Sequence, residues 1–106
     1  MIQTINLNFQ ISGTKIFLPF QAICSVTDKI FMGDIVIEYS PTDKALEYVD
    51  AEKVVTSFTQ VKLTAEELTY KVFTEVTDSI NPKYLKVLID VKKSEAHQPV
   101  QVWLEK

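Results

Sequence analysis

The spacing of the apolar residues changes twice along this chain, and this change restricts the folds that it can form. Between Ile5 and Tyr39 apolar residues recur at every second position, which is the period of a β-strand. Between Val54 and Ile80 they recur every three to four residues, the period of an α-helix. From Leu85 to Leu104 the alternation returns. Strands, then helices, then strands within 106 residues predict a single α+β domain over residues 1–106.

Three strands are predicted before the helices. Ile5 to Ile11 forms the first strand, and Ser12–Thr14 forms a hairpin loop that leads to the second. The second strand runs from Ile16 to Ala22. It contains Pro19, which has no N–H group to donate, so we expect this strand either to lie at an edge of the sheet or to be bulged at Pro19. The third strand is centred on residues Ile35–Tyr39.

Two helices are predicted in the middle of the chain. Asp50 can cap a short helix with one apolar stripe, formed by Val54, Phe58 and Val61. Thr64 and Glu67 have the spacing of a capping box, which predicts that a second helix begins there. Asn81-Pro82 ends this helix because proline cannot continue the hydrogen-bond ladder. Its expected buried face consists of Leu68, Val72, Phe73, Val76 and Ile80.

Two further strands, Leu85–Val91 and Val100–Leu104, complete the chain. Short connections between successive strands favour an antiparallel sheet with both helices on one face. The first and last strands are then edges. Because exposed edges pair readily with other strands, natural proteins usually cover them, and we expect a homo-oligomer.

Composition excludes several classes of function. The net charge is −3, and all 11 basic residues are lysines, so bidentate arginine contacts to phosphate or guanine are excluded. The two glycines form no phosphate-binding loop or dinucleotide fingerprint, and no metal-ligand spacing occurs; we expect no cofactor and no metal. No apolar run is long enough to span a bilayer, and the first residues do not resemble a signal peptide. With one cysteine, this favours a cytoplasmic protein without a membrane partner.

Three residues could carry chemistry. Cys24 follows an apolar strand and enters a polar loop, where it is either a reactive thiol or a small core residue. Glu66 lies in the first turn of the second helix. The helix dipole and the free N–H groups there favour a carboxylate whether or not it has a function. His97, the only histidine, lies in the loop between the last two strands. It could act with Cys24 only if the fold or a neighbouring subunit brought the two together.

Several segments, in their order and spacing, resemble one enzyme family. They are Ile23–Thr27, the strand Asp34–Tyr39 followed by Pro41, then Glu47, Thr56–Phe58, Glu66–Leu68 and Asn81–Val87. The chain resembles the 7-cyano-7-deazaguanine reductases and their short archaeal relatives, the QueF-like amidinotransferases, over roughly Phe20 to Val91. This resemblance implies a tunnelling fold (T-fold), a ββααββ subunit that assembles into barrels with active sites between subunits.

The resemblance also implies a chemistry. The cysteine of the family, here Cys24, attacks a nitrile carbon and forms a covalent thioimidate. The reductases then deliver hydride from NADPH, whereas in the archaeal relatives ammonia displaces the sulfur and yields the amidine of archaeosine on a tRNA base. Glu66 matches the glutamate that holds the deazaguanine. Thr27 and Glu47 are further expected substrate contacts, and Asp28, or alternatively Asp34, is the expected replacement for a catalytic acid.

The chain departs from the family at four positions. Phe31 stands where the family has its acid, Ala65 where it has a histidine, and Ser25 where it has a proline. Thr59 replaces the arginine that follows Ser-Phe in the reductases, which weakens the reductase interpretation. The sequence therefore predicts an amidinotransferase acting on a deazaguanine base or the tRNA that carries it. A non-catalytic T-fold paralogue, binding a purine-like ligand or serving as a scaffold, and an NADPH-dependent nitrile reductase are the alternatives.

Overall fold

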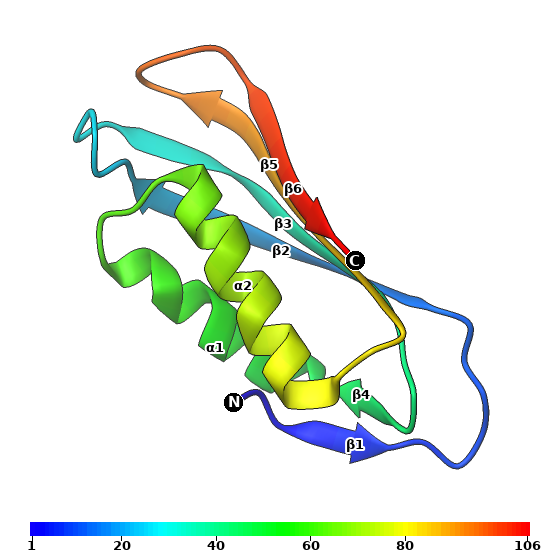
Figure 1. Cartoon of the computed structure of the whole chain (residues 1–106). Coiled ribbons are helices and arrows are strands. Elements are labelled where there is room, and N and C mark those ends of the chain that lie inside the picture. Colours follow the sequence, from blue (N-terminus) through cyan, green and yellow to red (C-terminus); the bar gives the residue numbers. More distant parts are fainter.

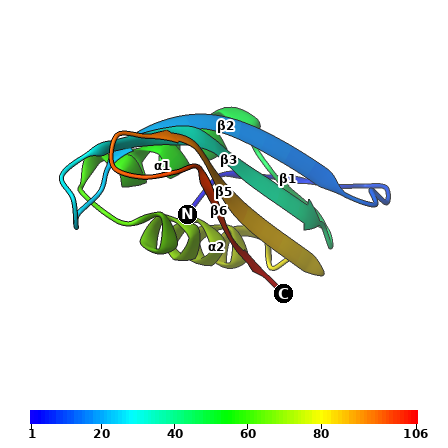
Figure 2. The same cartoon turned by 90° about the horizontal axis from the view of Figure 1, so that it is seen from above.

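Four long strands form one antiparallel sheet in the order β2-β3-β5-β6, and the two helices pack against one of its faces (Figures 1 and 2). The computed structural model describes all residues, 1–106. A second, two-stranded sheet pairs β1 with β4 beside the start of α1. The elements, in chain order, are β1 (Thr4–Asn6), β2 (Thr14–Ile23), β3 (Ile30–Ser40), β4 (Lys44–Leu46), α1 (Tyr48–Ser57), the short 3₁₀ helix η1 (Phe58–Gln60), α2 (Ala65–Ile80), β5 (Tyr84–Ser94) and β6 (Val100–Glu105).

The main sheet follows the predicted alternation. The apolar residues at alternate positions of β2, β3 and β5 are buried beneath the helices, with an interruption at the partly exposed Gly33, while the residues between them face outward. β2 and β6 are the sheet edges, as Pro19 in β2 and the position of the last strand predict. The inward-facing strand residues are Ile16, Leu18, Phe20, Ala22, Phe31, Ile35, Ile37, Tyr39, Leu85, Val87, Ile89 and Val91.

The long helix α2 is bounded by the signals read from the sequence. Thr64 Oγ1 accepts a hydrogen bond from the Glu67 backbone N–H at 3.1 Å, and the Thr64 backbone N–H donates to Glu67 Oε1 at 3.0 Å. These two bonds form the predicted capping box. At the other end Asn81 adopts the left-handed conformation (φ 44°) and the next residue, Pro82, prevents continuation. The expected apolar face is buried against the sheet.

The prediction for the first strand is only partly confirmed. β1 is short, ends at Asn6, and pairs with β4 rather than with β2. Phe9 and Ile11, predicted to lie in this strand, are exposed, and residues 12–14 do not form a hairpin loop. The residue that this segment buries is Ile2, whose N–H donates to Ser79 Oγ at 3.0 Å. Local alternation predicts a strand but does not specify its partner.

The first helix begins earlier than predicted. Glu47, not Asp50, is its N-cap: Glu47 Oε2 accepts a hydrogen bond from the Asp50 N–H at 2.6 Å. Asp50 instead accepts a hydrogen bond from the Gln3 N–H at 2.7 Å and so fixes the N-terminal segment. The earlier start places Ala51 and Val55 on the buried face, and leaves the predicted Val61 beyond the helix and exposed. Neither helix is both long and apolar enough to cross a membrane.

Gly33 lies at an irregularity of the β3–β5 pairing, where the register shifts between Met32 and Gly33. A Cβ atom at this position would lie 1.8 Å from the Asp90 carbonyl oxygen and 2.8 Å from the Lys92 backbone nitrogen. Because both contacts are backbone atoms of the neighbouring strand, the two strands would have to separate. We expect Gly33→Ala to lower the free energy of unfolding by about 1–3 kcal/mol, as overpacked interiors do, in urea denaturation.

Gly13 offers a matched control. A Cβ atom there would lie 3.4 Å from the Tyr39 carbonyl oxygen, which is ordinary contact, and φ is not positive. We expect Gly13→Ala to leave stability unchanged or to raise it by about 0.4–1 kcal/mol through the unfolded state. Equal unfolding free energies for the two variants would contradict the close approach at Gly33.

Candidate functional site

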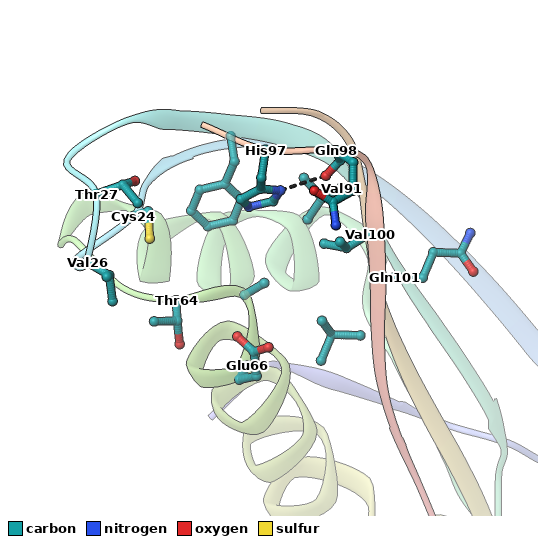
Figure 3. A pocket seen from close by; sticks show the side chains of 13 residues that line it. Cys24, Val26, Thr27, Thr64, Glu66, Val91, His97, Gln98, Val100 and Gln101 are labelled. Carbon is teal, nitrogen blue, oxygen red and sulfur yellow. Dashed lines mark hydrogen bonds between the residues drawn. The ribbon is translucent and has the colours of Figure 1, made fainter. Parts of the chain in front are cut away.

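A cavity of about 590 Å³ opens at one end of the molecule, where three segments meet (Figure 3). The first is the loop after β2, which carries Cys24 and Thr27; the second is the start of α2, with Glu66. The third is the loop between β5 and β6, with His97. Apolar side chains complete the lining, among them Phe31, Val91, Val100 and Val102. The cavity thus combines an apolar wall with a few polar groups, as small-molecule sites usually do.

The backbone of the loop after β2 holds Cys24 in place. The Cys24 N–H donates to the Lys29 carbonyl at 2.9 Å, and the Asp28 N–H donates to the Cys24 carbonyl at 2.9 Å. Asp28 adopts a left-handed conformation (φ 59°), which closes this tight turn. Cys24 is half-buried in the cavity wall, so its thiol is held by the fold and remains accessible.

The same loop favours the thiolate form of Cys24. Hydrogen bonding from the backbone N–H of Thr27, then from that of Val26, and then from the Thr27 hydroxyl lowers the pKa of the Cys24 thiol below its ordinary value. Partial desolvation and the negative charge of Glu66 oppose this shift without reversing it. The thiolate is the nucleophilic form of cysteine. The backbone N–H groups and the hydroxyl of this loop therefore favour the nucleophilic form of the sulfur.

Glu66 is exposed in the first turn of α2, where Figure 3 shows its carboxylate beside the cavity. The neighbouring Glu67 completes the capping box. Glu66 forms no hydrogen bond or ion pair with another side chain of the protein, so its oxygens are free to accept hydrogen bonds from a ligand.

Two of the predicted site residues lie elsewhere in the structure. Asp28 does not line the cavity: its Oδ1 pairs with Lys62 Nζ at 2.8 Å, and this hydrogen bond lowers the pKa of the Asp28 carboxyl. A carboxylate held in its charged form is a poor proton donor. Glu47 caps α1 at the end of that helix remote from Cys24 and also lies outside the cavity lining. Within one subunit, both residues have structural roles.

The sequence alone does not decide whether His97 lies near Cys24, and the structure places it in the wall of the same cavity (Figure 3). The signal that could have located it is the topology. In an antiparallel sheet of order β2-β3-β5-β6, the end of β2 and the loop between β5 and β6 lie at the same end of the sheet. His97 and Cys24 therefore border the same cavity although they lie 73 positions apart in the chain, at positions 24 and 97.

Phe31 forms part of the apolar wall. Its ring is buried and packs edge-on against Phe20, with ring centroids 5.7 Å apart and an interplanar angle of 73°. Ala65, at the start of α2, also faces the cavity. The positions where the resemblance expects an acid and a histidine therefore do contribute to this cavity, but with side chains that cannot transfer a proton. The protein contains no cluster of three or more histidine, cysteine or acidic residues that could hold a metal ion.

Comparison with solved structures identifies the fold. The chain matches the archaeosine synthase QueF-Like, solved in its apo form, with a TM-score of 0.82 and 22% sequence identity over 92% of this chain and 95% of that chain. No family model matches the sequence. The predicted α+β T-fold subunit and its resemblance to the QueF-like proteins are therefore confirmed at the level of structure.

The hydroxyl of Thr27 provides a test of the activated thiol. Replacing Thr27 by Val removes the smallest of the three hydrogen-bonding contributions at Cys24, so the pKa of the Cys24 thiol should rise while remaining below its ordinary value. The thiolate fraction at a given pH then falls, and the pH profile of iodoacetamide alkylation moves to higher pH. Thr27→Ser, which keeps the hydroxyl and the bond that Thr27 Oγ1 accepts from the Lys29 N–H, should retain the original profile. Identical profiles for Thr27→Val and the unmodified protein would contradict this role.

Proposed function

We propose that this chain, which has the fold of a QueF-like protein, is a QueF-like amidinotransferase of deazaguanine modification. The observation that supports this proposal most strongly is the joint position of two groups. A thiol with a lowered pKa at Cys24 and an unengaged carboxylate at Glu66 border one cavity, although they come from different elements. The solved protein of the same fold is named an archaeosine synthase, and that name agrees with the amidine-forming reaction proposed for this chain.

In the proposed reaction Cys24 Sγ forms a bond to the nitrile carbon of 7-cyano-7-deazaguanine. One electron pair of the C≡N bond moves to nitrogen, which takes up a proton and gives a thioimidate. Ammonia then adds to the same carbon and loses a proton, the C–S bond breaks, and the thiolate is released. The product is an amidine, and no electrons are exchanged with a redox cofactor.

Glu66 suits recognition of the base. A deazaguanine presents ring and exocyclic N–H donors side by side, and an ionised carboxylate accepts two such bonds with its two oxygens. Thr27, on the opposite side of the cavity, supports the sulfur through its backbone N–H and hydroxyl. A cavity of about 590 Å³ accommodates a bicyclic base. In this proposal Phe31 supplies an apolar surface for the flat ring.

The assembly and the substrate form are part of the same proposal. The outer edges of β2 and β6 have no strand partner within the chain, so a homo-oligomer would cover them and add a second wall to the open cavity. The proposed substrate is the deazaguanine base, either free or carried by tRNA. Because the net charge is −3 and arginine is absent, tRNA contacts would rely on lysines. A filter-binding measurement at increasing salt, in which tRNA affinity should fall, checks this part directly.

Incubation with 7-cyano-7-deazaguanine tests the chemistry. Intact mass should increase by the mass of one nitrile ligand per chain, and the adduct should be absent in Cys24→Ala. Added ammonia should remove the adduct and release the amidine.

The variant Glu66→Gln tests recognition of the base. It should raise the ligand concentration for half-maximal adduct formation about 10- to 100-fold, the loss expected for hydrogen bonds to a charged group. Glu52→Gln, an exposed glutamate on α1 outside the cavity, removes the same charge and serves as the control.

Two results would favour the other functions. If the nitrile binds but forms no adduct at any pH, the chain is a binding or scaffold paralogue, the function that the apolar Phe31 and Ala65 favour. If added NADPH is consumed with the nitrile, the reaction is a reduction rather than amidine formation.

A further inference from the structure

We propose that His97 is the proton-transfer group of this cavity, donating to the nitrile nitrogen during sulfur addition and accepting a proton when ammonia attacks. This inference rests on the function proposed above, and it assigns the proton transfers that the function requires. It begins from the shared position of Cys24, Glu66 and His97, which border one cavity but come from three separate segments (Figure 3).

The other candidate groups are committed elsewhere or cannot transfer protons. Asp28 is paired with Lys62 outside the cavity. Phe31 and Ala65 are apolar. Glu66 is the carboxylate assigned to recognition of the base. Of the titratable side chains that line the cavity, namely Cys24, Glu66 and His97, only His97 is left for proton transfer.

The loop that carries His97 is tied to the strand beside Cys24. The Glu95 N–H donates to the Ile30 carbonyl at 3.0 Å, and the Ile30 N–H donates to Glu95 Oε1 at 3.1 Å. Ile30 in turn pairs with Ile23, the residue immediately before Cys24. The loop and the thiol are therefore both positioned by one residue at the start of β3.

A serine hydroxyl fixes the loop at His97 itself. Ser94 Oγ accepts hydrogen bonds from the N–H groups of Ala96 and His97, at 3.1 Å and 3.3 Å. The His97 side chain is also held, because its Nδ1 lies 2.6 Å from the Gln98 carbonyl oxygen (Figure 3). An exposed loop histidine without such contacts would sample many orientations; here the backbone and the ring are both constrained.

The bond to Gln98 also determines which ring nitrogen reacts. A carbonyl oxygen can only accept, so Nδ1 must carry the hydrogen. In the neutral ring Nε2 is then the atom with the free lone pair, and in the charged ring Nε2 carries the proton that can be transferred. The Nδ1–H···O=C bond persists in both states, so one nitrogen holds the ring while the other exchanges the proton.

The proton balance closes over the reaction. Sulfur attacks the nitrile carbon, the displaced electron pair goes to nitrogen, and charged His97 gives its Nε2 proton to that nitrogen, becoming neutral. Ammonia then attacks the thioimidate carbon, and neutral His97 takes the proton that ammonia loses. The C–S bond breaks and the thiolate leaves. His97 ends in its starting charge state, and ammonia and nitrile together give the amidine.

The variant His97→Gln tests the proposal because glutamine has a similar size but cannot transfer a proton. The rate of adduct formation with 7-cyano-7-deazaguanine should fall about 10²–10⁴-fold, the usual contribution of general acid–base catalysis. Alkylation of Cys24 by iodoacetamide needs a thiolate but no protonation of the reagent. Measured at a pH where its rate has reached a plateau, alkylation should therefore stay within about twofold. Added imidazole should restore adduct formation in His97→Gly, which a merely structural role of His97 would not allow.

A second nitrile separates this proposal from the proposed function. 2-Cyanopyrimidine reacts with thiolates through the same addition and protonation but lacks the donors that Glu66 would bind. If it adds to Cys24 with the His97 dependence described, and 7-cyano-7-deazaguanine does not, the proton-transfer role stands and the deazaguanine function fails. If 7-cyano-7-deazaguanine adds to His97→Gln at the unmodified rate, the proton-transfer role is overturned and the deazaguanine function stands. If neither nitrile adds to the unmodified protein, both proposals are overturned.

Discussion

The antiparallel pairing at the start of β3 is the constraint on which the rest of the site depends. Ile30 pairs with Ile23 on one side and exchanges two hydrogen bonds with Glu95 on the other. These contacts bring the end of β2 and the loop between β5 and β6 to the same end of the sheet. The start of α2 joins them because the Leu63 N–H donates to the Ile23 carbonyl at 3.1 Å. Three distant segments thus converge on one pair of residues, Ile23 at the end of β2 and Ile30 at the start of β3.

In the proposed reaction, activation of the sulfur and transfer of protons are carried out by different groups of the cavity. Backbone N–H groups of Thr27 and Val26 lower the pKa of the Cys24 thiol, and such groups do not titrate. These hydrogen bonds favour the thiolate without the help of an adjacent acid or base. In the proposed reaction Phe31, at the position where the resemblance expects an acid, contributes only apolar wall, and the histidine on the opposite loop transfers the protons.

The sequence predicts most of the fold because several signals are local. The capping box at Thr64, the stop at Asn81 and the alternation in β2, β3 and β5 each depend on residues close together in the chain, and all three agree with the structure. The failures occur where a partner is distant. β1 pairs with β4, and Glu47 rather than Asp50 caps α1, because Asp50 is engaged by Gln3, 47 positions away. Periodicity contains no information about such partners.

The sequence by itself determined that Cys24 ends a strand in front of a polar loop and that Glu66 opens a helix, since strand ends and helix caps are encoded by neighbouring residues. Only the tertiary structure decided that these two groups border one cavity, that Asp28 and Glu47 lie outside it, and that His97 lies within it. The physical reason is the strand order β2-β3-β5-β6. It is set by hydrogen bonds between segments that are far apart in the chain, and it brings the only histidine to the end of the sheet that carries the only cysteine.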